Sequence, residues 1–148
     1  MNPTNRYSIA TALNVLALSI LASGCIVVVK EDDENDRRRY LHGSEWTLEV
    51  VFYRTQTLNS VDRAVEVQFQ EDGTVSGKAI CGVFSGEYEI NENGGISVFS
   101  VESSTSCQAN AEFDLVSSGL KAAETYDVNE SALTISTKSE GYLSFSAK

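Results

Sequence analysis

The sequence predicts a small, mainly β domain: a curved antiparallel sheet or barrel of about eight strands with one packed α-helix. Three observations support this fold class. From Gly43 to Lys148, short runs alternate apolar and polar side chains, which is the two-residue period of a strand. Turn residues such as Gly, Asn and Asp separate these runs. One segment carries apolar residues at helical spacing, and 148 residues are enough for one domain with a single core.

The segment Met1–Gly24 is typical of an export signal, with Arg6 and the free amine followed by an apolar run. It ends in Ala22-Ser23-Gly24-Cys25, which is similar to the cleavage box of bacterial lipoproteins. That resemblance implies removal of Met1–Gly24 and acylation of Cys25 by a fatty acid such as palmitate. We therefore expect an exported lipoprotein anchored in the outer membrane, at its periplasmic face or on the cell surface. An uncleaved helix is the alternative, because the apolar run from Ile9 to Val29 is long enough to cross a bilayer.

Cys25 to His42 is predicted to be a charged, flexible tether between the anchor and the domain. Its charges form two opposite blocks, acidic from Glu31 to Asp36 and basic from Arg37 to Arg39, which is typical of a solvated linker. A second interpretation uses Lys30–Asp33, which resembles the lysine-plus-acid signal for surface export in lipoproteins of the Bacteroidetes type. The folded domain is expected from Gly43 to Lys148.

The first predicted strand of this domain has its even-numbered apolar residues, from Trp46 to Phe52, on one face. Trp46 leads that face and is expected to anchor the core. The segment 54–61 lacks a period and is predicted to be a loop. Strands over 63–70 and 75–79 then pair across the turn signal Glu71-Asp72-Gly73-Thr74.

A turn at Cys81 is the next predicted feature. Apolar positions are odd-numbered up to Ala79 and even-numbered from Phe84, so the chain must turn or bulge between them. Gly82 is the natural pivot, because glycine takes positive φ without steric cost. A second hairpin follows, in which 83–90 pairs with 96–101 through the turn 91–95.

The two cysteines of the domain are predicted to form a disulfide. A bond from Cys81 to Cys107 would tie the turn to the far end of the second hairpin, and closing such a loop contributes about 3 to 4 kcal/mol in the chain-entropy model. A zinc site of Cys81, Cys107 and His42 is the alternative, but these residues lack the close-spaced ligand pairs of zinc sites. An oxidising compartment favours the disulfide, so no metal site is expected.

One helix is predicted from about 108 to 122, where Ala109, Phe113, Val116 and Leu120 recur at helical spacing. The strand before it, 96–101, is apolar on both faces. We therefore expect the helix to cover the outer face of that strand. Three short strands close the chain, at 126–128, 132–137 and 142–147.

A family resemblance covers residues 41–148. The segment from Gly77 to Tyr88, GKAICGVFSGEY, is similar to the G-x-x-G-C-N-x-F-x-G-x-Y signature of the META domain, also called HslJ-like. Ile80 stands where the family has glycine, and Gly82 stands where it has asparagine. Further matches follow in the family's order, and together the matching residues are Leu41, Gly43, Trp46, Leu48, Gly77, Cys81, Phe84, Gly86, Tyr88, Cys107, Phe113, Leu120, Leu133 and Phe145.

The resemblance implies a β-rich fold, with structural motif residues that are Trp46, Gly77, Gly82, Phe84, Gly86 and Tyr88. Members of the family are linked to heat shock and antibiotic response in bacteria and to virulence in trypanosomatids, without a settled activity. Gly82 is expected to keep the backbone role of the family's asparagine, because both residues adopt left-handed conformations readily, and to lose its amide.

Charge and residue types argue against nucleic-acid binding and catalysis. The net charge is −10, and loss of Met1–Gly24 with Arg6 makes it −11, so a phosphate backbone is repelled. The one histidine, His42, falls at the junction of tether and domain and is predicted to be an exposed linker residue, so no histidine-dependent catalytic site is expected. Carboxylate pairs such as Glu87 and Glu89 are interpreted as surface charge rather than as a glycosidase pair. No phosphate-binding loop occurs, and no cofactor is expected.

Bulky apolar side chains are expected to fill the barrel. The predicted inward set is Trp46, Leu48, Phe52, Val67, Phe69, Phe84, Tyr88, Ile90, Leu133, Leu143 and Phe145. The leading hypothesis is a non-catalytic envelope module that acts through contacts with an unknown envelope protein. The alternative is a carrier or sensor of a small apolar ligand, because an eight-stranded barrel can hold one and Gly77, Ala79 and Gly86 can leave a void. An inhibitor of a secreted hydrolase is a third hypothesis, with no specific residue behind it.

Overall fold

The computed structural model describes residues 32–59, 65–91, 93–107 and 110–148. The predicted signal segment and Cys25 lie outside the described residues. Two α-helices, a short 3-10 helix η1 and nine strands make up the described chain. In order they are α1 (Asp32–Gly43), β1 (Glu45–Tyr53), β2 (Gln56–Asn59), β3 (Glu66–Phe69), β4 (Thr74–Ala79), β5 (Gly82–Ile90), β6 (Ile96–Ser103), η1 (Thr105–Cys107), α2 (Ala111–Lys121), β7 (Ala123–Val128), β8 (Ala132–Thr137) and β9 (Gly141–Ala147).

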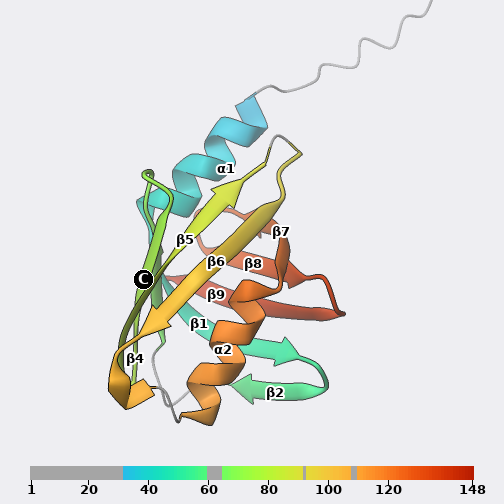
Figure 1. Cartoon of the computed structure of the whole chain (residues 1–148). Helices are drawn as coiled ribbons and strands as arrows, with labels where there is room; N and C mark the ends of the chain where they lie inside the picture. The colour runs from blue at the N-terminus through green and yellow to red at the C-terminus, as the bar shows by residue number, and fades with distance from the viewer. Residues whose placement is uncertain (1–31, 60–64, 92, 108–109) are drawn as a thin grey trace, which may run out of the picture.

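All the strands belong to one antiparallel sheet that curls into a nearly closed barrel (Figure 1). The order around the wall is β6-β5-β4-β3-β1-β9-β8-β7, and β2 pairs with β1 beside β3. The two edge strands meet near one point, where Gly95 bridges Thr125. The predicted fold class is therefore confirmed.

Both predicted hairpins are present. β3 pairs with β4 across the turn at Gly73, which has φ +85°. β5 pairs with β6, and Gly82 at the start of β5 has φ +144°, a conformation that only glycine adopts without strain. The three closing strands also form where the alternation predicts them, as β7, β8 and β9.

The alternation predicted for β1 breaks half-way along the strand. Trp46 and Leu48 are buried, but the register against β9 shifts between Leu48 and Val50. Beyond this bulge the odd-numbered Val51 and Tyr53 point into the core and Phe52 becomes half-buried. The prediction that Phe52 points inward is wrong, because one extra residue in a strand reverses the faces of all residues after it.

The segment 54–61 is only partly a loop. β2 (Gln56–Asn59) continues the chain back along β1 through a two-residue turn at Arg54 and Thr55. Their φ values of +50° and +69° are those of the mirror-image turns that suit hairpins. The sequence hides this turn, because it lacks the glycine or asparagine that usually occupies such positions.

Helix α2 forms inside the predicted range, but it does not cover the outer face of β6. Asn110 caps its start, where the side-chain Oδ1 accepts a hydrogen bond of 2.9 Å from the Phe113 N–H.

A change of register and a positive φ at Ser100 reverse the faces of β6, so Val101 is buried and Phe99 stays 37% exposed on the outside. The apolar face of α2 packs toward the barrel interior instead, against β1, β6 and β9.

The end of the predicted tether is a helix docked on the barrel. Leu41 of α1 is fully buried, and its carbonyl accepts a hydrogen bond of 3.1 Å from the indole N–H of Trp46. The Arg37 guanidinium lies 4.6 Å from the ring centroid of Tyr126 and donates to the Tyr126 carbonyl. The prediction of a flexible tether over Cys25–His42 is therefore wrong from Asp32 onward. These few contacts hold an otherwise polar helix against the barrel.

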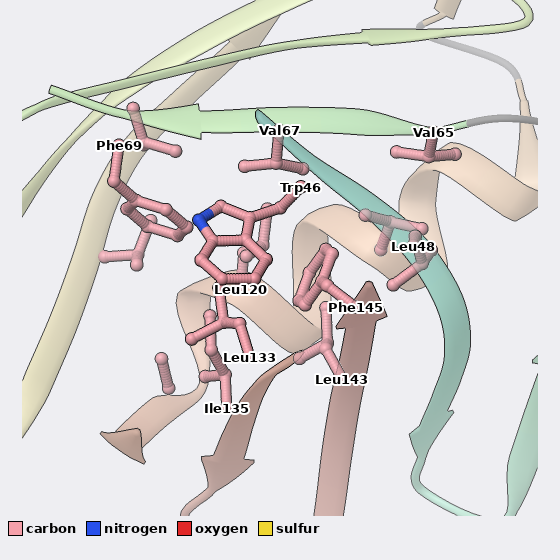
Figure 2. Close-up of a cluster of buried hydrophobic side chains, with 14 of the residues drawn as sticks. Trp46, Leu48, Val65, Val67, Phe69, Leu120, Leu133, Ile135, Leu143 and Phe145 are labelled. Atoms are coloured by element: carbon pink, nitrogen blue, oxygen red, sulfur yellow. The ribbon is translucent and has the colours of Figure 1, made fainter. Parts of the chain in front are cut away.

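A contiguous apolar core fills the barrel (Figure 2). The Trp46 ring lies at its centre, among Val67, Phe69, Leu120 and Phe145, which are each at most 1% exposed. Of the predicted inward set, Ile90 joins Phe52 in being only partly buried, and the others are in the core. Among the described helices, none is long and apolar enough to cross a membrane.

Candidate functional site

The two ends of the barrel differ in chemistry, and they are the places where the predicted site residues gather. Helix α1 covers one end, and the turn between β4 and β5 lies with η1 at the other (Figure 1). We call these the α1 end and the tip, and we define the tip as Ile80–Val83 with Ser104–Cys107.

The tip is held by a disulfide and by hydrogen bonds. Cys81 and Cys107 are joined by an S–S bond, with Cα atoms 4.9 Å apart. The Ser104 N–H donates to the Val83 carbonyl at 3.0 Å, and the Ser106 hydroxyl donates to the Cys81 carbonyl. Two backbone segments more than twenty residues apart are thereby fixed side by side, so the tip is a rigid part of the fold.

Gly82 makes this packing possible. A Cβ at this position would lie 2.2 Å from the Ser104 Oγ, which is far inside van der Waals contact. The Ser104 hydroxyl occupies that space. Its oxygen lies 3.1 Å from the Ser106 Oγ and 3.8 Å from the Cys107 sulfur, so its one hydrogen has two possible acceptors. The position that carries the family's asparagine thus leaves room here for a serine from the neighbouring segment.

Two aliphatic side chains of the tip face solvent. Ile80 is 66% exposed and Val83 is 62% exposed, and they flank the half-buried Cys81. Together with Phe99 and Tyr142 they are the large apolar side chains that the described chain leaves exposed. Because both lie on one disulfide-bonded turn, the tip is the candidate contact surface.

Two features of the sequence indicate this surface. Ile80 replaces the glycine of the family signature, and the alternation of β5 sends Val83 outward.

The α1 end is polar and is centred on Tyr88. Its phenol donates to the Gln70 carbonyl at 2.7 Å and therefore accepts from the His42 Nε2, also at 2.7 Å. Burial raises the pKa of Tyr88 to about 12. Burial also lowers the pKa of His42, which favours the neutral imidazole.

His42 is thus half-buried and hydrogen-bonded, which corrects the prediction of an exposed linker residue. Its ring contacts the Tyr88 ring edge-on, and His42 lies at the opposite end of the barrel from the two cysteines. The structure therefore does not bring Cys81, Cys107 and His42 together as a zinc site would require. That the protein is not an enzyme stays a prediction.

The predicted structural residues support the wall and the core. A Cβ on Gly77 would lie 2.3 Å from the Phe84 ring and from the Glu66 carbonyl, so this glycine makes room for Phe84. Gly86 lies where β6 passes closely, and a Cβ there would lie 3.1 Å from the Phe99 carbonyl oxygen. Neighbouring atoms therefore occupy the space beside Gly77 and Gly86 in which the ligand hypothesis placed a void.

Most of the carboxylates that we interpreted as surface charge are exposed. Glu87 and Glu89 are exposed on the outer face of β5. In the first turn of α2, Asp114 is exposed and Glu112 is half-buried. Lys148 pairs with Glu45 at 3.2 Å and with Glu66 at 2.8 Å, and the hydrogen bond from this lysine is the main cause that lowers the pKa of Glu66.

The described residues leave little room for a ligand inside the barrel. One crevice enters the core near the tip, between Leu58, Val65, Ala79 and Phe113, and it holds only about 20 Å³. A site for a drug-sized ligand needs about 300 Å³ or more. Larger hollows, such as one of about 500 Å³ between the β1–β2 hairpin and α2, are open grooves on the surface.

Known proteins give a fold and a family for this architecture. No curated protein matches the sequence. An NMR structure of a protein from Burkholderia xenovorans is 12% identical, with a TM-score of 0.59 over 76% of this chain and 88% of that one. A second NMR structure is 25% identical, with a TM-score of 0.51 over 72% and 90% of the two chains.

A DUF4847 family protein from Bacteroides vulgatus has a TM-score of 0.48 at 15% identity, over 55% of this chain. The chain spans just over half, 57%, of the length of that protein. The model of the META domain matches residues 39–148, which include both cysteines of the tip and all strands of the barrel. The chain therefore belongs to the META domain family.

Proposed function

We propose that this META-domain protein is a non-catalytic, lipid-anchored module of the bacterial cell envelope that acts by contacting another envelope protein through the tip. The observation that carries the proposal is the exposure of Ile80 and Val83, 66% and 62%, on a turn fixed by a disulfide. An exposed side chain on a rigid turn loses little conformational entropy when a partner covers it.

The filled interior supports a contact surface over a ligand carrier. The Trp46 ring and its neighbours are at most 1% exposed, and the crevice near the tip holds about one water molecule. A carrier would need the core to open, which costs the packing of the most buried side chains. A surface protein contact needs no such change.

The anchor is inferred from the sequence at Cys25. Asp32, where α1 begins, follows Cys25 by seven residues, which span at most about 24 Å of extended chain. A lipid on Cys25 would therefore hold the α1 end near the membrane. The tip lies at the other end of the barrel and would face away from the lipid, toward a partner (Figure 1).

The contact is tested by site-specific photo-crosslinking in intact cells. We expect a crosslinker at Val83 to give a discrete adduct with a second protein, because this position is 62% exposed at the tip. The matched control is a crosslinker at Ser97, an exposed position on the outer face of β6. The same adducts from both positions, or none from Val83, would contradict a contact at the tip.

The anchor is tested separately by labelling with a fatty-acid analogue. Cys25→Ser should abolish the label, because the thiol is the proposed attachment site. Cys81→Ser is the matched control, and it should keep the label. Unchanged labelling of Cys25→Ser would refute lipidation at Cys25.

A further inference from the structure

The disulfide of the tip is asymmetric in its exposure. Cys107 is fully buried, whereas Cys81 is only half-buried and belongs to the exposed turn. Thiol–disulfide exchange requires a thiolate to reach one of the two sulfur atoms, so access decides which sulfur is attacked. Cys107 therefore offers no exposed surface to an incoming thiolate, whereas the Cys81 residue does.

The surroundings of the two sulfur atoms also favour attack on Cys81, with Cys107 as the leaving sulfur. Attack on Cys81 releases Cys107 as the leaving thiolate. The Ser104 hydroxyl oxygen lies 3.8 Å from the Cys107 sulfur and 3.1 Å from the Ser106 Oγ, so its hydrogen can be donated to either. A hydrogen bond to a charged group is stronger than one to a neutral group, so donation to the sulfur becomes favoured as negative charge develops on Cys107. Gly82 keeps the space for that hydroxyl free of a side chain.

The flanks of Cys81 offer a surface for a protein reagent. Ile80 precedes the cysteine and Val83 follows two residues later, and both are more than half exposed. A small thiol needs no docking surface, whereas an oxidoreductase must place its own cysteine against Cys81. Exposed aliphatic side chains on both sides can supply that contact.

We propose that the tip is a site of reversible exchange with a dithiol oxidoreductase, which forms its mixed disulfide at Cys81. The oxidoreductase thiolate attacks the Cys81 sulfur, the Cys81–Cys107 bond breaks, and its electron pair goes to the Cys107 sulfur, which then takes a proton. The second thiol of the oxidoreductase attacks the mixed disulfide and releases the Cys81 thiol. The tip gains two electrons and two protons, and the oxidoreductase becomes a disulfide; the reverse sequence installs the bond in the tip.

This inference uses the same tip as the proposed function but does not depend on an envelope partner or on the lipid. A failure of the crosslinking experiment leaves the exchange chemistry intact. Conversely, a disulfide that does not exchange at Cys81 leaves the contact surface of Ile80 and Val83 intact.

The site of attack is tested with the oxidised full chain and an oxidoreductase whose second cysteine has been replaced by serine. Mixed disulfides are quenched with acid and located by peptide mapping without reduction. We expect at least about tenfold more adduct on Cys81 than on Cys107, because Cys107 is fully buried. Equal amounts, or an excess on Cys107, would overturn the proposal.

The role of Ser104 is tested by the rate of reduction with dithiothreitol. Ser104→Ala should slow reduction about three- to tenfold, since the leaving sulfur loses its hydrogen bond. Ser97→Ala is the matched control, because Ser97 is an exposed serine of β6 outside the tip, and its rate should stay within about twofold. Equal rates for the two variants would remove Ser104 from the mechanism.

The docking surface is tested by comparing the protein reagent with the small one. The double variant Ile80→Ser, Val83→Ser should lower the rate with the oxidoreductase at least about fivefold relative to the rate with dithiothreitol. A ratio that does not change would refute docking on these side chains. The ratio is informative even if the variant is less stable, because a looser tip raises both rates together.

Discussion

Leu41→Ala tests whether α1 is an integral part of the domain. Leu41 is fully buried, although it lies in a segment whose sequence is typical of a tether. The substitution removes three carbon atoms, worth about 0.8 kcal/mol each, and leaves a cavity that relaxes only in part. We expect the free energy of unfolding to fall by about 3 kcal/mol.

Urea unfolding followed by two probes measures this effect. Trp46 is the only tryptophan, and its N–H donates to the Leu41 carbonyl, so its fluorescence reports both α1 docking and global unfolding. Circular dichroism reports the barrel as a whole. If α1 is integral, both probes give coincident transitions in the wild type.

Arg39→Ala is the matched control on the same helix. Arg39 is 69% exposed and pairs with Asp36 at 3.2 Å, so its loss should change the free energy of unfolding by no more than about 0.5 kcal/mol. A loss below about 0.5 kcal/mol for Leu41→Ala would refute the reasoning. So would a fluorescence change that precedes the change in circular dichroism, because α1 would then detach on its own.

Three further predictions concern the barrel. Reduction of the Cys81–Cys107 bond, which links residues 26 positions apart, should lower the free energy of unfolding by about 3.5 kcal/mol, measured by urea titration with and without reductant; an unchanged midpoint would contradict it. Gly77→Ala should lower the free energy of unfolding by about 1 to 3 kcal/mol, because its Cβ would overlap the Phe84 ring and the Glu66 carbonyl. Adding Phe84→Leu to this variant should recover part of the lost free energy, and additive losses would argue against the overlap. The pKa of Tyr88 is raised to about 12 in the folded protein, so the unfolded chain loses this proton first as pH rises. The free energy of unfolding should therefore fall between about pH 10 and 12. Tyr88→Phe should flatten this fall, and an unchanged slope would exclude Tyr88 as its cause.

Local turn chemistry and alternation were enough to predict most of the barrel. Gly73 and Gly82 mark their turns because the backbone there needs positive φ, and the strands that follow them, β4 and β5, have a clear period. The apolar spacing of α2 made that helix predictable in the same way, within a few residues at its start.

What the sequence concealed depends on backbone events and on tertiary contacts. The bulge after Leu48 leaves no mark in residue type, and Arg54 and Thr55 adopt positive φ without a turn residue. Helix α1 resembles a linker in sequence because its order depends mainly on one buried leucine and on the contact between Arg37 and Tyr126. The tip was predicted as a turn, but the exposure of Ile80 depends on where the disulfide places it.

The pairing of β1 with β9 also constrains how the protein is made. β1 lies between β3 and β9, so its second neighbour in the wall is synthesised only after all the other strands of the domain. Until Gly141–Ala147 is synthesised, one edge of β1 has no partner and the wall cannot be completed. A domain with this topology therefore stays incompletely folded until its last strand, β9, has been synthesised.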